Sequence, residues 1–285
     1  MAGVAGNIGS NHDDACEMEE IGMTRPEHLE DVDAVVEAII EQRGPRISLA
    51  LPLGIGKANH IANALVDRAL DGEIEHLEIF TALTLNPPEA ASGLQQRLMG
   101  PVVERLYGDY VPLDYGVLRA EGELPDNIVV REFYYPPGSL IGNEHAQRNH
   151  KSVNYTHALR EVLDADIDVL AQLVAPSRSS ADRYDLGGNT DLSLDIFEEY
   201  ARRRRAGEDV PVLVAQVNRE LPALGGSAEV DDAHFDFVLD NRELDFPPFG
   251  LPRMAPELAE FAIGIRASSL LKDGGTIQVG IGSMG

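Results

Sequence analysis

Residues 46–70 read RISLALPLGIGKANHIANALVDRAL, and this stretch decides the fold. It opens with a short apolar run, which a Gly-Ile-Gly turn follows at residues 54–56. Beyond the turn, Ile61, Leu65 and Ala69 recur at helical spacing. The stretch therefore predicts a strand over 46–53, a glycine turn, and a helix over 58–70.

The same alternation of strand and helix continues on both sides of this stretch. Short apolar runs predict further strands at residues 76–83, 127–135, 167–174 and 211–217. Helical periodicity predicts helices at residues 27–43, 91–107, 155–164 and 190–205. Apolar strands that alternate with helices are typical of parallel sheets covered on both faces. We therefore predict an α/β fold with an open, mostly parallel sheet flanked by helices.

Composition divides the chain into four parts. Residues 1–25 are polar and acidic and predict a flexible tail, and residues 26–225 hold the α/β domain. Residues 226–255, which hold prolines and several acids, indicate a segment that connects two lobes. Residues 256–285 predict a helix at 256–271, a strand at 276–279 and a glycine turn. We interpret this last part as the truncated start of a second, similar domain.

Such a fragment is too short to cover its own apolar face. We therefore expect exposed side chains at four apolar positions in a monomer, namely Ile265, Leu270, Ile277 and Val279. A second copy of the chain, or a complementary C-terminal half, is the expected partner for them.

Charge and composition exclude several classes of protein. The net charge of -25 repels phosphate backbones and acidic lipid headgroups, so we expect no binding to nucleic acid or membranes. No apolar run of about 18 residues occurs, the N-terminus lacks a signal-peptide pattern, and the single cysteine, Cys16, excludes a disulfide framework. The expected location is the cytoplasm. A local basic pocket can still bind a small anion.

Two glycine turns follow predicted strands and are candidates for a binding site. One is Gly54-Ile-Gly56-Lys57-Ala-Asn59, and the other is Gln278-Val-Gly280-Ile-Gly282. Glycines there let a backbone approach a ligand closely, and open α/β sheets bind ligands at the carboxyl ends of their strands. An ordinary tight turn explains either pattern equally well. Neither turn is a P-loop or a complete dinucleotide fingerprint.

Several blocks along the chain resemble, in order, the acetyl-CoA hydrolase/CoA-transferase family. They include LPLGIGKANHIANALVDRAL, FYYPPGSLIGN, QRNHKSVNYTH, GGNTDLSLD and DGGTIQVGIGSMG. The resemblance runs from about residue 27 to the end of the chain. Ala58 departs from it, because the family often has proline at that position.

This resemblance implies two CoA-transferase domains with an active site between them. In the family, a glutamate attacks an acyl-CoA, and an acyl-glutamyl anhydride and then a glutamyl-CoA thioester are formed. That glutamate lies beyond Gly285, so no catalytic residue is assigned here, and the chain alone is expected to be inactive. The implied substrates are an acyl-CoA thioester and a small carboxylate or water, with no permanently bound cofactor and no metal.

The resemblance also assigns residues to the cleft that binds the CoA substrate. Gly54, Gly56, Lys57 and Asn59 match the loop of the first domain, and Lys57 is expected to meet a carboxylate or a CoA phosphate. The turn of the second domain corresponds to Gln278, Gly280 and Gly282, and Asn218 is expected to line the cleft. Two alternatives remain, a non-catalytic module that binds CoA or a partner, and one half of a split enzyme.

Overall fold

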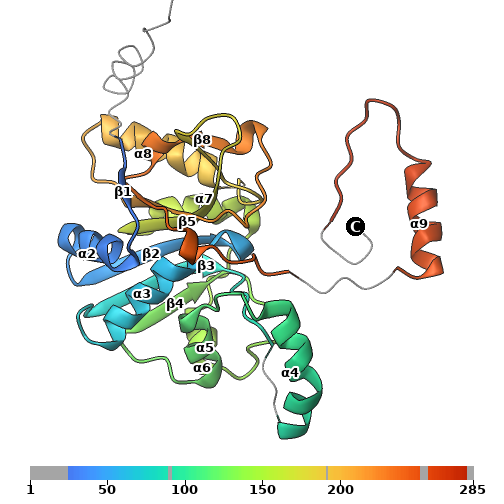
Figure 1. The fold of residues 1–285 in the computed structure, drawn as a ribbon, viewed down its shortest axis with the longest axis horizontal. Coiled ribbons are helices and arrows are strands. Elements are labelled where there is room, and N and C mark those ends of the chain that lie inside the picture. Colours follow the sequence, from blue (N-terminus) through green and yellow to red (C-terminus); the bar gives the residue numbers. More distant parts are fainter. Residues whose placement is uncertain (1–24, 89–91, 191, 251–255, 281–285) are drawn as a thin grey trace, which may run out of the picture.

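A computed structural model describes residues 25–88, 92–190, 192–250 and 256–280. Within these residues the main sheet has parallel strands in the order β1-β9-β7-β5-β2-β3-β4 (Figure 1). Their bounds are β1 Glu27–Leu29, β2 Arg46–Leu53, β3 His76–Ala82, β4 Ile128–Glu132, β5 Val169–Pro176, β7 Val212–Val217 and β9 Phe237–Leu239. Two short antiparallel strands, β6 (Arg183–Asp185) and β8 (Glu229–Asp231), extend it from β5. The predicted α/β fold is confirmed.

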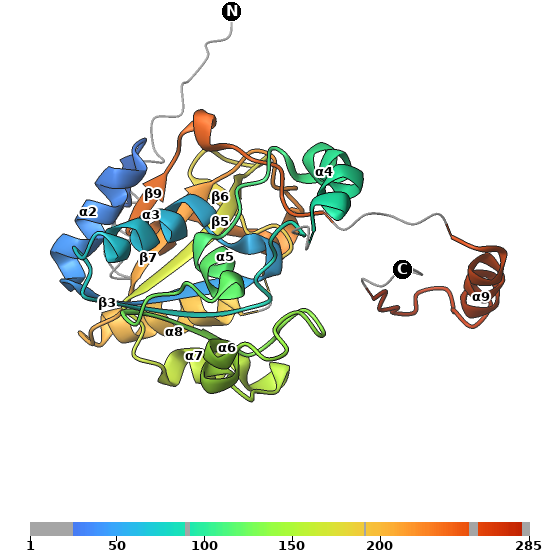
Figure 2. The same ribbon diagram turned by 90° about the horizontal axis from the view of Figure 1, so that it is seen from below.

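Helices cover both faces of the sheet (Figure 2). One layer holds α2 (Val32–Arg43), α3 (Asn59–Leu70) and α5 (Asp114–Glu121), and the other holds α7 (Ala158–Asp164) and α8 (Ser193–Arg205). Helix α6 (Glu144–Asn149) packs beside β4, while α4 (Gly93–Tyr107) stands out from the body (Figure 1). Short 3-10 turns lie at η1 Gly54–Gly56, η2 Tyr155–His157, η3 Gly226–Ala228, η4 Asp232–His234 and η5 Arg242–Leu244.

The two faces of the sheet carry two separate cores. On the α3 side, Ile61 and Leu65 pack on Leu49 and Ile79, whereas on the α8 side Ile196 and Phe197 pack on Leu170. Every residue of β7, and every residue of β5 before Pro176, is buried. Strands covered on both faces need apolar side chains in both directions, which explains their nearly continuous apolar sequence.

The N-terminal part of the described chain differs from the prediction of one helix over 27–43. Residues 27–29 instead form β1, which pairs with β9 at the edge of the sheet. Helix α2 begins only at Val32 because the side chain of Asp31 accepts a hydrogen bond from the backbone of Asp33 (3.1 Å) and caps it.

Residues 229–246 belong to the first domain, so the interpretation of residues 226–255 as a connecting segment is wrong for this part. Strand β9 lies between β1 and β7, with Phe237, Val238 and Leu239 all buried. Phe246 is buried too, against Leu173 and Leu221. Three apolar residues suffice to add a strand to an existing sheet, but they are too few to stand out from a proline-containing segment by periodicity.

Helix α9 (Leu258–Ser268) lies apart from the sheet (Figure 1), and most residues from 256 to 280 are exposed. Ile265, Leu270, Ile277 and Val279 are 72%, 81%, 57% and 61% exposed, as expected for apolar side chains without a covering layer. The predicted strand at 276–279 is wrong, because these residues pair with no other strand in the described part of the chain. Among the described residues, no helix has the length and apolar character to cross a membrane.

Candidate functional site

The sheet changes its direction of growth between β2 and β5. From β2 the chain adds β3 and β4 on one side, and it then returns to add β5, β7 and β9 on the other. The segment after β2 leads to α3 on one face, while the segment after β5 leads to α8 on the opposite face. Open α/β sheets bind ligands at such a switch point, outside the carboxyl ends of the strands. Topology thus points to the segments that follow β2 and β5, and the Gly54–Gly56 turn is the first of them.

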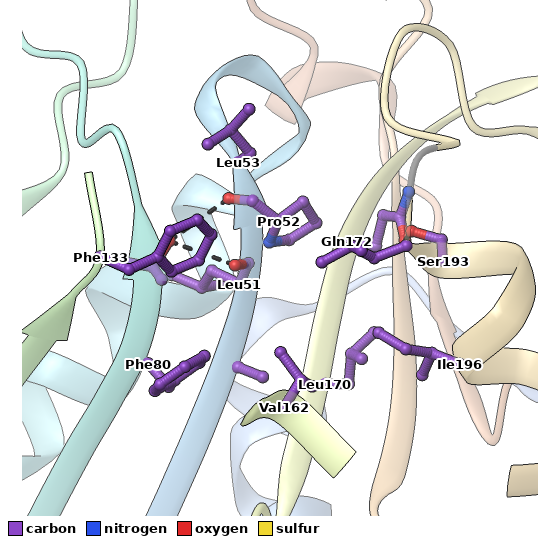
Figure 3. A pocket seen from close by; sticks show the side chains of 13 residues that line it. Leu51, Pro52, Leu53, Phe80, Phe133, Val162, Leu170, Gln172, Ser193 and Ile196 are labelled. Carbon is purple, nitrogen blue, oxygen red and sulfur yellow. Dashed lines mark hydrogen bonds between the residues drawn. The ribbon is translucent and has the colours of Figure 1, made fainter. Parts of the chain in front are cut away.

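Strands β2 and β5 separate toward this switch point. They pair only at Leu49 with Val169 and at Ala50 with Leu170, whereas β5 stays paired with β7 up to Val174. Pro52 has no backbone N–H to offer to a neighbouring strand, and the register between β2 and β3 shifts between Ala50 and Leu53. The separation leaves a pocket beneath the glycine turn, lined from both strands (Figure 3).

The turn requires glycine at positions 54 and 56 for two different structural reasons. Gly54 has a φ of +63°, a left-handed conformation that residues with a side chain rarely adopt. At Gly56 a Cβ atom would lie 2.5 Å from both Cγ and Oδ1 of Asn189. Asn189 Nδ2 in turn donates to the carbonyl of Leu53 (2.6 Å) and so holds the start of the turn. The sequence prediction of a turn from a strand end into a helix N-terminus is confirmed for residues 54–59.

Lys57 lies beneath the turn and is only 1% exposed. Its Nζ donates to the carbonyls of Pro52 (2.5 Å) and Ala82 (2.7 Å), so it ties the ends of β2 and β3 together. Burial lowers the pKa of Lys57 to about 7, although nearby Glu132 opposes this shift. The expectation that Lys57 meets a carboxylate or a phosphate of a ligand is therefore wrong for this structure, because its amine is enclosed and already hydrogen-bonded.

A buried ion pair lies close to Lys57. Arg119 Nη1 donates to Oε2 of Glu132 (2.5 Å), and both side chains are almost fully buried. The other carboxylate oxygen, Oε1, accepts from the backbone N–H of Thr84 (2.6 Å). The hydroxyls of Thr84 and Tyr115 are hydrogen-bonded to each other (3.1 Å), and burial raises the pKa of Tyr115. This cluster ties α5 and the end of β4 to the segment after β3.

Two predicted asparagines hold loops in place rather than face a ligand. Asn59 Nδ2 donates to the carbonyl of Val111 (2.7 Å) and to the hydroxyl of Tyr110 (3.2 Å). Asn218 Nδ2 donates to the carbonyl of Phe246 (2.8 Å), and its Oδ1 accepts from the backbone of Glu220 (3.0 Å). Both side chains are buried. The expectation that Asn218 lines the cleft is wrong here, since its buried side-chain amide is hydrogen-bonded to the backbone of Glu220 and Phe246.

His60 and Gln216 form a further polar pair at the carboxyl end of β7. Gln216 Nε2 donates to Nδ1 of His60 (2.9 Å), and burial lowers the pKa of His60. Oε1 of Gln216 is buried and has no hydrogen-bond partner within the described residues. In the same part of the chain, no group of three or more histidine, cysteine or acidic side chains is arranged to hold a metal ion.

The second predicted turn does not join this site. Gln278 and Gly280 are exposed and follow α9, away from the sheet, while Gly282 lies outside the described residues. Of the predicted site residues, the structure therefore brings together Gly54, Gly56, Lys57 and Asn59. Gln278 and Gly280 of the second turn, which were expected to face these residues, lie away from them.

Sequence reasoning missed several polar residues of this region. Gln172 and Gln216 each interrupt an otherwise apolar strand, VLAQLV and VLVAQV, and a buried polar residue in such a run was the available signal. Gln172 lies opposite Lys57 in an isolated β-bridge. The sequence around Asn189 carries no such signal. Asn189 can hold the turn only because residue 56 is a glycine, which leaves room for the asparagine side chain.

The fold and the site can be compared with known proteins. No protein-family model and no curated protein matches the sequence. RipA from Yersinia pestis matches with a TM-score of 0.58 at 19% identity, over 89% of this chain and 53% of RipA. A RipA variant gives a TM-score of 0.59 at 19% identity, over 90% of this chain and 50% of its own. A 4-hydroxybutyrate CoA-transferase from Porphyromonas gingivalis gives 0.47 at 16% identity, over 90% and 49%.

At these identities the likeness to RipA shows a shared fold. The chain spans about half the length of the RipA structures that it matches.

Proposed function

We propose that this chain supplies the acyl-CoA-binding domain of a CoA-transferase or acyl-CoA hydrolase. Three observations support the proposal: the ordered sequence blocks that resemble this family, the fold shared with RipA, and the glycine turn at the switch point between β2 and β5. The third carries most weight, because it is a property of this chain's own geometry and lies where α/β sheets bind ligands.

In this proposal the turn at residues 54–56 lies against the thioester portion of the substrate. Glycine at 54 and 56 lets the backbone approach closely, and fixed backbone dipoles there can stabilise negative charge that develops on a carbonyl oxygen. Lys57 and Asn189 act beneath the turn and hold its shape, through the bonds to Pro52, Ala82 and Leu53. They are positioning residues, since neither side chain is free to reach a substrate.

The proposed reaction needs a carboxylate that attacks the acyl-CoA and is then regenerated by a small carboxylate or by water. Glu132 is near the turn but is fully buried, and both of its oxygens accept hydrogen bonds from Arg119 and Thr84. It is therefore not assigned as the nucleophile. The glutamate of the reaction, and the surface that completes the site, are proposed to come from a second domain or another chain.

Substitution of Gly56 tests the position of the substrate. We expect the wild-type chain to bind CoA in isothermal titration calorimetry, and Gly56→Ala to weaken binding at least tenfold. The reason is steric, because the new Cβ would force away Asn189, which holds the turn.

Gly93→Ala is the matched control, since a Cβ at Gly93 meets no atom within 4 Å. It should bind CoA like the wild type, and thermal unfolding of both variants separates a local change from loss of the fold. Wild-type protein that fails to bind CoA, or a Gly56→Ala variant that binds normally, would contradict the assignment.

We expect the chain alone to bind acetyl-CoA without turning it over. The physical reason is that Glu132, the carboxylate described beside the turn, is buried and already accepts hydrogen bonds from Arg119 and Thr84. The measurement is thiol release from acetyl-CoA, with and without acetate as the acceptor. Turnover well above the uncatalysed rate would require a nucleophile within these 285 residues.

A further inference from the structure

Helix α4 presents an apolar face that the rest of the described chain leaves uncovered (Figure 1). Tyr107, at its end, is its one buried residue. Apolar side chains recur at every fourth position and so form a stripe along the helix, made of Leu94, Leu98, Val102 and Leu106. These four side chains are between 46% and 79% exposed.

Helix α4 is a poor helix by its own composition. Gly100 and Pro101 lie in its interior, and glycine and proline are the two weakest helix formers. An isolated helix of this length is marginal in water even when it is rich in alanine, and most helices in proteins are stabilised by packing of an apolar face. The stripe is therefore expected to be covered, and a contiguous apolar surface of this kind marks an interaction site.

Helix α9 has the same unmet requirement. Leu258, Phe261 and Ile265 share one face at helical spacing and are between 58% and 86% exposed. No residue of α9 is buried against the described part of the chain. Two helices of one chain thus carry apolar faces that fit each other in kind.

The chain leaves the α/β domain beside the C-terminal end of α4. The ring of Phe249 stacks on that of Tyr107, with 4.8 Å between the ring centroids and 18° between the planes, and its edge-to-face contact with Tyr110 measures 5.4 Å between centroids. The stretch from Phe249 to Leu258 can span up to about 30 Å when extended. Helix α4 is about 22 Å long, so α9 can reach any part of it within the same chain.

We propose that α9 docks antiparallel on the apolar stripe of α4 in the same chain. Figures 1 and 2 show α9 away from α4, so docking is a second arrangement of the same two helices. One register brings all the apolar positions of α9 onto the stripe, with Leu258 beside Leu106, Phe261 beside Val102 and Ile265 beside Leu98.

Charge favours the same direction and register. Arg105 lies in the last turn of α4, and Glu257 and Glu260 lie at the start of α9. The antiparallel register places Arg105 beside these two carboxylates, and it sets the negative end of one helix dipole beside the positive end of the other. Docking would fix how the chain beyond α9 leaves the α/β domain. It uses no residue of the glycine turn and does not rest on the proposed function.

A designed disulfide tests the register. Cys16 is the one cysteine of the chain, so Cys16→Ser gives a background without thiols. In that background, Leu98→Cys combined with Ile265→Cys should form a disulfide within a single chain under mild oxidation. The measurement is mass spectrometry of the oxidised protein, together with its size by light scattering.

The matched control moves one cysteine to the other side of α9. Ala267 lies two positions beyond Ile265 and faces away from the stripe in the proposed register. Leu98→Cys with Ala267→Cys should therefore stay reduced under the same conditions. Equal oxidation of the two pairs, or of neither, would overturn the docking. A disulfide found only between two chains would replace it by an exchange of α9 between copies.

Hydrogen exchange tests the contact without cysteines. Phe261→Asp on α9 should make the backbone amides of α4 exchange about tenfold faster, because a buried charge opposes docking and α4 loses its cover. Leu224→Asp is the control, since Leu224 is exposed and lies outside both helices. Unchanged exchange in the strands β5 and β7 would show that the variants are folded. If α4 exchanges equally fast in the wild type and in Phe261→Asp, α9 does not cover it.

Discussion

Replacement of Glu132 by leucine should cost about 3–5 kcal/mol of unfolding free energy, because it leaves the guanidinium of Arg119 buried without its counter-charge. Arg119 is 3% exposed and Glu132 is fully buried, so water cannot take over the lost interaction. The same substitution removes the acceptor of the Thr84 backbone N–H, which is also buried. The expected loss is large against the total stability of a typical domain.

Denaturant unfolding of three variants distinguishes the buried charge from simple loss of packing. Arg119→Met combined with Glu132→Leu should recover much of the stability lost by Glu132→Leu alone, since an apolar pair can replace a buried ion pair. Glu144→Leu, which breaks the exposed Glu144–Arg148 pair, should change stability by less than about 1 kcal/mol. A small loss in Glu132→Leu, or no recovery in the double variant, would show that the pair does not hold this region.

Much of the sheet could be predicted from sequence because its strands are buried on both faces. Residues 46–53, 76–83, 167–174 and 211–217 stand out as apolar runs, and the structure has strands at all four places. Strand β9 could not be predicted in this way. Its three residues follow a short antiparallel strand rather than a helix, so the alternation that marks the others is lost.

The site was predictable only in part, because the sequence shows local turn signals but not the contacts that form on folding. Gly54 and Gly56 are visible in sequence because turns that need a left-handed residue or a close approach select glycine. The pairing of Arg119 with Glu132 could not be predicted from the sequence, since charged residues are numerous in this chain and only tertiary packing decides which of them are buried. Lys57 shows why residue type alone was insufficient. A lysine beside a glycine turn suggested that it binds an anionic ligand, but in the structure its amine is buried and hydrogen-bonded to backbone carbonyls.

Lys57 gives the second prediction, a rise in stability between pH 7 and pH 9. Burial holds the pKa of Lys57 at about 7 in the folded protein, well below its ordinary value of 10.5. Between these two values the unfolded chain binds a proton that the folded chain does not, so unfolding becomes less favourable as the pH rises. Below pH 7 both states carry the proton, and this group contributes no slope. A neutral amine still has two N–H groups for the carbonyls of Pro52 and Ala82.

The rise expected from Lys57 is about 2–3 kcal/mol of unfolding free energy between pH 7 and pH 9. Other described groups with shifted pKa values contribute little slope here, since burial moves the pKa of His60 below its ordinary 6.5 and that of Tyr115 above its ordinary 10. Denaturant unfolding at half-unit pH steps measures the slope for the wild type and for Lys57→Met. The variant should be flat over this range, whatever its absolute stability, because methionine does not titrate. Parallel curves for the two proteins would mean that Lys57 keeps its ordinary pKa and that water or a counter-charge reaches it beneath the turn.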